Sequence, residues 1–174
     1  MNNQEYSVWI FLRHMSDALQ YLHHQHPPVI HRDLKPDNII GKKVASGVRT
    51  RRLEDCRLRN RTSAAKECIR TVVYNARTQI GTEMWSLGVV MSFYCNRRHL
   101  FGNVPSVLRW EGGRSTLVRR HEYSIDLRQL IADLLGPIAH SRPTAIRVLQ
   151  ECDKNGRQDL FAQYGIPRVY YLCS

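Results

Sequence analysis

The chain has 174 residues and a formal net charge of +11, from 26 basic and 15 acidic side chains. This length suits one domain with a sizeable core, and a hydrophobic content of 43% excludes a disordered chain. Five scattered cysteines, with no C-x-x-C pair, exclude a disulfide framework and a cysteine zinc site and favour a reducing compartment.

The first predicted element is an amphipathic helix from about Glu5 to His24. Its apolar residues recur at three- and four-residue spacing: Val8, Phe11, Leu12, Met15, Leu19 and Leu22. Pro27-Pro28 should end it, because proline cannot continue the hydrogen-bonded ladder. Three histidines lie near this end (His23, His24 and His26) and could suggest a metal cluster, but solvated or capping histidines fit a proline-terminated helix better.

The residues before this helix are polar and lack the basic-then-apolar pattern of a signal peptide. The most apolar stretch, Trp85–Cys95, is interrupted by serines and is too short to span a bilayer. We therefore expect an intracellular protein, cytoplasmic or nuclear, with no membrane partner.

Residues 30–38 read Ile-His-Arg-Asp-Leu-Lys-Pro-Asp-Asn. The run holds a carboxylate at Asp33, a cation at Lys35 and an amide oxygen at Asn38. Phosphoryl transfer needs these groups: a base for the attacking hydroxyl, a positive charge for the phosphate and an oxygen ligand for Mg²⁺. The run resembles the H-R-D-L-x-x-x-N catalytic loop of protein kinases at every fixed position.

The resemblance implies a role for each of these residues. Asp33 would be the catalytic base, with a loop-bonding or N-cap aspartate as the alternative. Lys35 would bind ATP and neutralise the transferring phosphate, as in Ser/Thr-directed kinases, with a solvated lysine as the alternative. Asn38 would bind Mg²⁺ and nucleotide. His31 and Arg32 are expected to be structural, and Arg32 could also clamp a phosphorylated or acidic residue.

Short apolar segments flank the motif: Val29-Ile30 before it and Ile39-Ile40 after it, both predicted to be strand-like. Residues 41–62 read as a loop around a short hairpin. Eight basic residues crowd between Lys42 and Arg61, which indicates either an anion-binding surface or a solvated, Arg-rich loop. No aromatics alternate with these arginines, so a nucleic-acid partner has only net charge in its favour.

Leu53–Leu58 takes the place of the Asp-Phe-Gly run of kinases. Asp55 would be the second Mg²⁺ ligand and would contribute to the nucleotide site. Cys56 replaces a large apolar ring, and Arg57 replaces a glycine that tolerates φ > 0. Arg57 also places a cation beside the intended metal, which should weaken Mg²⁺ binding.

Further helices are predicted downstream of residues 63–82, which have no strong pattern. Met84–Tyr94 is apolar nearly all round, which indicates a buried helix. A Gly/Pro-punctuated stretch follows. A helical face then ends at Gly136-Pro137 and contains Leu127, Leu130, Ile131, Leu134 and Leu135. The last predicted helix begins near Thr144.

Four weaker runs occur in the order that kinases have them. Glu83–Gly88 resembles D-x-W-S-x-G, Asn96–Gly102 resembles G-x-x-P-F, and Ser141–Ala145 resembles R-P-T/S. Thr71–Thr78 resembles T-x-x-Y-x-A-P-E, but Arg77-Thr78 replaces Pro-Glu. In the family that glutamate pairs with the arginine matching Arg142, so a buried Arg142 would need another acid, or the region would be looser.

Together these runs predict a mainly α fold, like the C-terminal lobe of a protein kinase: a helical bundle with a short β hairpin near the catalytic loop. We expect one domain over residues 1–174, a partial kinase domain whose resemblance is strongest over 6–150. The N-terminal β lobe is expected to be missing, because 29 residues precede Ile30 and no G-x-G-x-x-G occurs.

The resemblance implies a protein serine/threonine kinase-like domain that uses ATP and Mg²⁺ on a protein substrate, weak or inactive as an isolated chain. The alternative is a pseudokinase or scaffold that binds protein partners. A missing lobe would leave an apolar interface uncovered near the catalytic loop and Cys56, so association with such a lobe or self-association is expected.

Overall fold

The computed structural model describes residues 3–43, 50–52, 80–96, 100, 122–155 and 168–172. Four α-helices make up most of this part: α1 (Asn3–His23), α3 (Ile80–Asn96), α5 (Ile125–Leu134) and α6 (Ala145–Asn155). Two short 3₁₀ turns, η1 (Pro36–Asn38) and η3 (Ala139–Ser141), and three strands complete it. The predicted mainly α fold class is confirmed.

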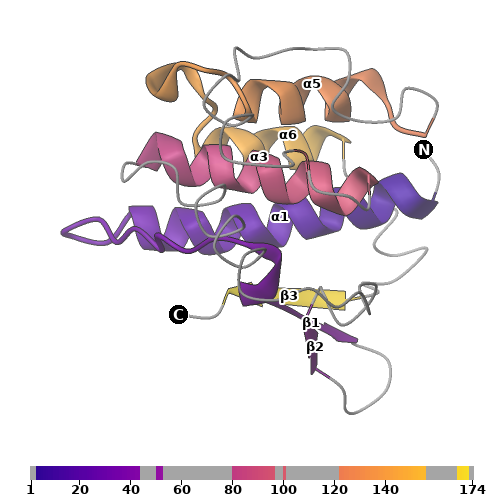
Figure 1. Ribbon diagram of the computed structural model, residues 1–174, viewed down its shortest axis with the longest axis horizontal. Helices are drawn as coiled ribbons and strands as arrows, with labels where there is room; N and C mark the ends of the chain where they lie inside the picture. The colour runs from indigo at the N-terminus through magenta and orange to yellow at the C-terminus, as the bar shows by residue number, and fades with distance from the viewer. Residues whose placement is uncertain are drawn as a thin grey trace.

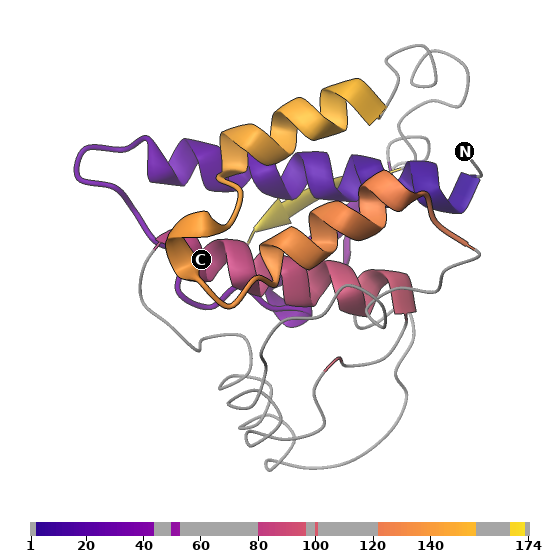
Figure 2. The ribbon, with the colours of Figure 1, turned by 90° about the horizontal axis from the view of Figure 1, so that it is seen from above.

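Helix α1 is the central element of the described structure. Its apolar face is fully buried, with Phe11, Leu12, Met15 and Leu19 each 0% exposed, as the spacing of these residues predicts. Helices α3 and α6 both pack on α1 (Figures 1 and 2). The buried carboxylate of Glu5 accepts hydrogen bonds from the Trp9 indole and from Ser124, the residue that caps α5. The first turn of α1 is thereby tied to the start of α5.

Helix α3 is buried over nearly its whole length, as its continuous apolar character predicts. It lies between α1 and α5 (Figure 1) and contacts both of them. A Cβ added at Gly88 would lie 2.9 Å from Leu134 Cβ and 2.9 Å from Leu135 Cγ, so a glycine is needed for this close approach of α5. A Cβ added at Gly81 would likewise overlap the carbonyl oxygen of Ala139 in η3.

The strands form one small sheet in the order β2-β1-β3. β1 (Ile39–Lys43) and β2 (Thr50–Arg52) are the predicted hairpin. The third strand, β3 (Arg168–Leu172), pairs antiparallel with the other edge of β1 and was not predicted. Figure 1 shows β3 between this hairpin and α1, with which it is also in contact.

The prediction of a strand at Val29-Ile30 is wrong. After α1 the chain turns back, and the Val29 N–H donates to the carbonyl of Leu22 at 3.0 Å, which closes the turn. A backbone donor used in this way is not free for a sheet. The predicted helix ends are confirmed: α5 stops before Gly136-Pro137, and α6 starts beside Thr144, whose Oγ1 accepts from the Arg147 N–H at 3.3 Å. Among the described helices, none has the length and apolar character needed to cross a membrane.

The close packing of α3 on α5 gives a first prediction. Gly88→Ala should lower the free energy of unfolding by about 1–3 kcal/mol, because its Cβ would overlap side-chain atoms of α5. Urea denaturation of the parent chain and of Gly88→Ala measures this difference in free energy. Asp17→Ala, at an exposed position of α1, is the control. Equal midpoints for Gly88→Ala and Asp17→Ala would contradict the packing described.

Candidate active site

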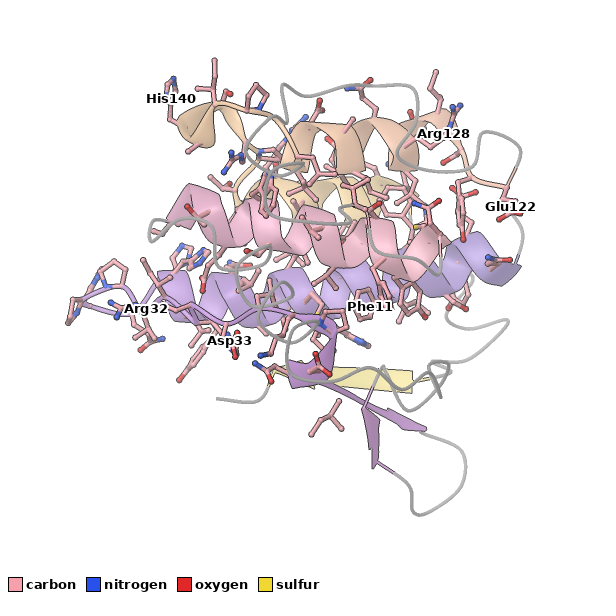
Figure 3. All side chains as sticks on the ribbon, in the orientation of Figure 1. Phe11, Arg32, Asp33, Glu122, Arg128 and His140 are labelled. Carbon is pink, nitrogen blue, oxygen red and sulfur yellow. The ribbon has the colours of Figure 1, made fainter. Side chains whose placement is uncertain are left out.

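The motif at residues 30–38 forms a loop that is anchored by buried apolar residues. Leu34 and Ile39 are 1% and 0% exposed, and Pro36 is buried at the start of η1. The polar residues Asp33, Lys35 and Asn38 are each adjacent in sequence to one of these anchors. Alternation of apolar anchors with polar residues therefore fixes the loop to the core, with the Asp33 side chain partly exposed and that of Lys35 mostly buried. Figure 3 shows Arg32 and Asp33 below α1, on the side of the sheet.

The structure brings Asp33, Lys35 and Asn38 into direct contact. The Lys35 ammonium lies 3.2 Å from Asp33 Oδ2, and Asn38 Nδ2 donates to the same oxygen at 2.7 Å. Asn38 Nδ2 also donates to the main-chain carbonyl of Asp33 at 2.8 Å. The Asp33 side chain is 40% exposed and that of Lys35 is 12% exposed. The Asp33 carboxylate is therefore held in place by two donors on one oxygen and remains accessible from solvent.

The orientation of the Asn38 amide follows from these contacts. Both groups that it faces are acceptors, so the NH₂ end must point toward Asp33. The Oδ1 atom is then directed away from Asp33, as an oxygen that can bind a hard cation such as Mg²⁺. Asn38 is also the last residue of η1, and Ile39 directly after it begins β1, so the sheet determines where this amide lies.

The loop is held to α3 by a hydrogen bond from the backbone of Arg32, a residue with an unusual backbone conformation. Arg32 has φ 65°, in the left-handed region that residues with a Cβ adopt at a cost of about 1–3 kcal/mol. Its N–H donates to Glu83 Oε1 at 2.8 Å, and the Glu83 side chain is only 3% exposed. This hydrogen bond to a buried carboxylate offsets the strain at the residue immediately before Asp33.

The second oxygen of Glu83 binds His23. His23 Nε2 lies 2.7 Å from Glu83 Oε2, and the His23 side chain is 7% exposed. The prediction of a solvated or capping histidine is therefore wrong for His23, because the end of α1 meets α3 here. His24 is exposed and bonds the carbonyl of Gln20 at 2.8 Å, as a helix-end residue, and His26 is exposed.

Arg142 is buried, with 6% of its surface exposed. Its guanidinium donates to three main-chain carbonyls: Gly81 at 2.7 Å, Gly136 at 2.7 Å and Pro137 at 3.2 Å. The sequence predicted another acid for this cation or a loosely packed region. Packing here is tight, and neutral carbonyls supply hydrogen bonds that join the start of α3 to the segment after α5.

Several predicted features lie outside the described residues. These include the second metal ligand Asp55 with its neighbours Cys56 and Arg57, and the run Thr71–Thr78. Of the Arg-rich segment, the structure describes only the strand backbones. Sequence reasoning missed the bridging role of Glu83, which it noted only as the first residue of the run Glu83–Gly88. The pairing of a helix-end histidine with a carboxylate in a buried helix would have been the signal.

Comparison with known proteins now decides the family. Residues 3–152 match the protein kinase domain family. The chain belongs to the protein kinase family. It is 28% identical over 155 residues to ribosomal protein S6 kinase alpha-1 of Rattus norvegicus, covering 78% of this chain and 21% of that protein. It is 27% identical over 158 residues to ribosomal protein S6 kinase alpha-1 of Mus musculus, covering 80% and 22%. This kinase-family chain thus spans about a fifth of the length of these relatives.

The Glu83 bridge gives a second prediction. Glu83→Ala should lower the free energy of unfolding by about 3 kcal/mol, because it leaves the Arg32 N–H and the His23 ring without their buried acceptor. His23→Ala should cost less, since Arg32 keeps its bond. The exposed His24→Ala is the matched control and should change stability by about 0.5 kcal/mol or less. Thermal and urea denaturation compare the three, and a His24→Ala variant as unstable as His23→Ala would refute the bridge.

Proposed function

We propose that this chain carries the catalytic loop of a protein serine/threonine kinase, within one partial kinase domain over residues 1–174. The family chemistry is transfer of the γ-phosphoryl group of ATP to a protein hydroxyl. The proposal is supported chiefly by the contact of Asp33 with Lys35 and Asn38, which places a base, a cation and a metal-ligand amide within one hydrogen-bonded cluster. The relatives' name as a kinase supports the same class.

Each residue of the cluster has a role that its position suits. Asp33 would accept the proton of the substrate hydroxyl, since its carboxylate is accessible and held in place by two donors. Lys35 would counter the charge of the transferring phosphate; its side chain is mostly buried, which holds the ammonium near Asp33. Glu83 positions both through the Arg32 backbone, without touching the reactants.

The described residues fit a magnesium nucleotide. Asn38 presents an amide oxygen directed away from Asp33, and this is the ligand type that Mg²⁺ prefers. Asn38 would hold the ion together with Asp55, and Mg²⁺ would neutralise charge on the phosphates when bound. The presence of Arg57 two residues after Asp55 supports weak rather than strong metal binding.

A pseudokinase or scaffold is the second candidate function. It is favoured by the sequence Asp55-Cys56-Arg57 in place of Asp-Phe-Gly, and by the absence of a G-x-G-x-x-G run from these 174 residues. Either function is proposed to be intracellular and to involve protein partners, including a kinase N-terminal lobe or a second copy of the chain.

A third prediction concerns nucleotide binding by the isolated chain. We expect the dissociation constant for MgATP to exceed about 1 mM, the weak end of ordinary enzyme–substrate affinities. Thermal-shift titration with ATP, with and without Mg²⁺, measures it. Stabilisation at micromolar MgATP that depends on Mg²⁺ would show a complete nucleotide site and would reject the expectation of a weak or inactive chain.

A fourth prediction concerns the base. Phosphotransfer from γ-labelled ATP to a generic serine/threonine substrate should fall at least about 100-fold in Asp33→Ala, because a positioned base contributes about 10²–10⁴-fold. Asp17→Ala, which removes an exposed carboxylate from α1, should leave the rate unchanged. Equal rates for Asp33→Ala and the parent chain would reject the assignment of Asp33. A parent chain with no measurable transfer would favour the scaffold.

A further inference from the structure

Strand β3 is the part of the described fold that the kinase resemblance does not explain. The match to the protein kinase family ends at residue 152, and β3 comprises Arg168–Leu172. Even so, this strand is built into the sheet beside the candidate site. It pairs with all five residues of β1, from Ile39↔Leu172 to Lys43↔Arg168.

The start of β1 is also the end of the catalytic loop. Asn38 closes η1, and the N–H of Ile39 bonds the carbonyl of Pro36 while Ile39 opens β1. The Asn38 amide in turn donates two hydrogen bonds to Asp33, at 2.7 and 2.8 Å. A shift in the backbone of Ile39 would therefore move Asn38 against Asp33 directly, with no intervening residue to absorb it.

Within the described sheet, the pairing next to Asn38 comes from β3 rather than β2. The residues of β1 that pair with β2 are Ile40, Gly41 and Lys42. Pairing with β3 starts one residue earlier in β1, at Ile39. A two-stranded hairpin alone is marginally stable in water, and a third strand or a packed helix is needed to hold it. β3 is the third strand, because it pairs with β1. It also contacts helix α1, so the sheet is packed against a helix (Figure 1).

We propose that β3 is a positioning element for Asn38: its backbone pairing with β1 holds the Asn38 amide against Asp33. The importance of this positioning for a magnesium nucleotide rests on the function proposed above. The pairing partner lies more than a hundred residues downstream of Asn38, so β3 is a separate segment of the chain and not part of the hairpin. The site thereby depends on a segment outside the matched kinase domain.

The test uses the alternating direction of the backbone N–H groups along β3, an edge strand of the described sheet. In an antiparallel pair, one residue directs its N–H to the neighbour and the next directs its N–H away. Of Tyr170 and Tyr171, one therefore donates toward β1, and proline there removes a ladder bond, whereas proline at the other is tolerated at an edge. The full-length variants Tyr170→Pro and Tyr171→Pro are thus controls for each other. Tyr170→Ala and Tyr171→Ala account for loss of the side chains.

Two measurements compare these variants in the absence of nucleotide. Amide hydrogen exchange reports the protection of Ile39–Lys43, with α1 as the internal reference. The side-chain NH₂ signals of Asn38 in ¹⁵N NMR, assigned by their loss in Asn38→Asp, report the contact with Asp33. We expect one proline variant to lower the protection of Ile39–Lys43 by about tenfold or more and to shift the Asn38 signals. The other proline variant and both alanine variants should retain them.

Three results would overturn the proposal. Asn38 signals that stay in place while β1 loses protection would make β3 a stabiliser of the sheet only. Equal effects of the two prolines would mean that backbone pairing is not the cause. Loss of protection in α1 as well would make β3 a requirement of the whole fold rather than of Asn38.

Measurement of MgATP binding by the same variants separates this proposal from the proposed function. In a chain that binds MgATP, the disrupting proline should weaken binding about tenfold relative to the other proline, as loss of a ligand's supporting contacts does. A parent chain that binds no MgATP would favour the scaffold over the kinase function proposed above, and the exchange and NMR results would still decide whether β3 holds Asn38.

Discussion

The carboxylate of Glu83 joins three parts of the fold: helix α3, the end of α1 and the loop at residues 30–38. It lies on the buried helix α3, accepts the N–H of Arg32 with one oxygen and meets the ring of His23 with the other. A buried carboxylate is costly unless its oxygens are satisfied, so the end of α1 and the loop must both approach α3 for the core to form. Formation of the hydrophobic core and correct placement of the loop are therefore one event.

This arrangement explains how a strained residue can be stable beside the proposed base. The local preference of Arg32 is against φ 65°, and its flanking sequence offers no glycine to relieve the cost. The tertiary hydrogen bond to Glu83 favours that conformation. Local and global preferences conflict at functional sites more often than elsewhere, and here the conflict directs Asp33 toward Lys35 and Asn38.

The same distinction between local and long-range causes separates what the sequence predicts from what it does not. The helices were predictable because periodic residues such as Phe11 and Met15 share one buried face. The site cluster was predictable because Asp33, Lys35 and Asn38 lie within six residues of one another. Val29-Ile30 was read wrongly as a strand because an apolar pair carries no sign that the Val29 N–H would bond Leu22.

Longer-range features could not be read in this way. The burial of His23 depends on a carboxylate 60 residues away, and the pairing of β3 depends on a strand more than a hundred residues upstream. Arg-Val-Tyr-Tyr-Leu has the β-branched and aromatic residues of a strand, but periodicity names no partner for it. Asp55 lies outside the described residues and stays a prediction.

The contacts of Arg142 show why architecture and activity are separable in this chain. Three main-chain carbonyls accept hydrogen bonds from this cation and link α3 to the segment after α5. Neither these contacts nor those of Glu83 involve a group that would touch nucleotide. The kinase architecture is thus maintained by interactions independent of ATP, so its retention is compatible with a scaffold as well as an enzyme. The residues that distinguish the two are those that meet phosphate and metal, and among the described residues only Asp33, Lys35 and Asn38 belong to that predicted set.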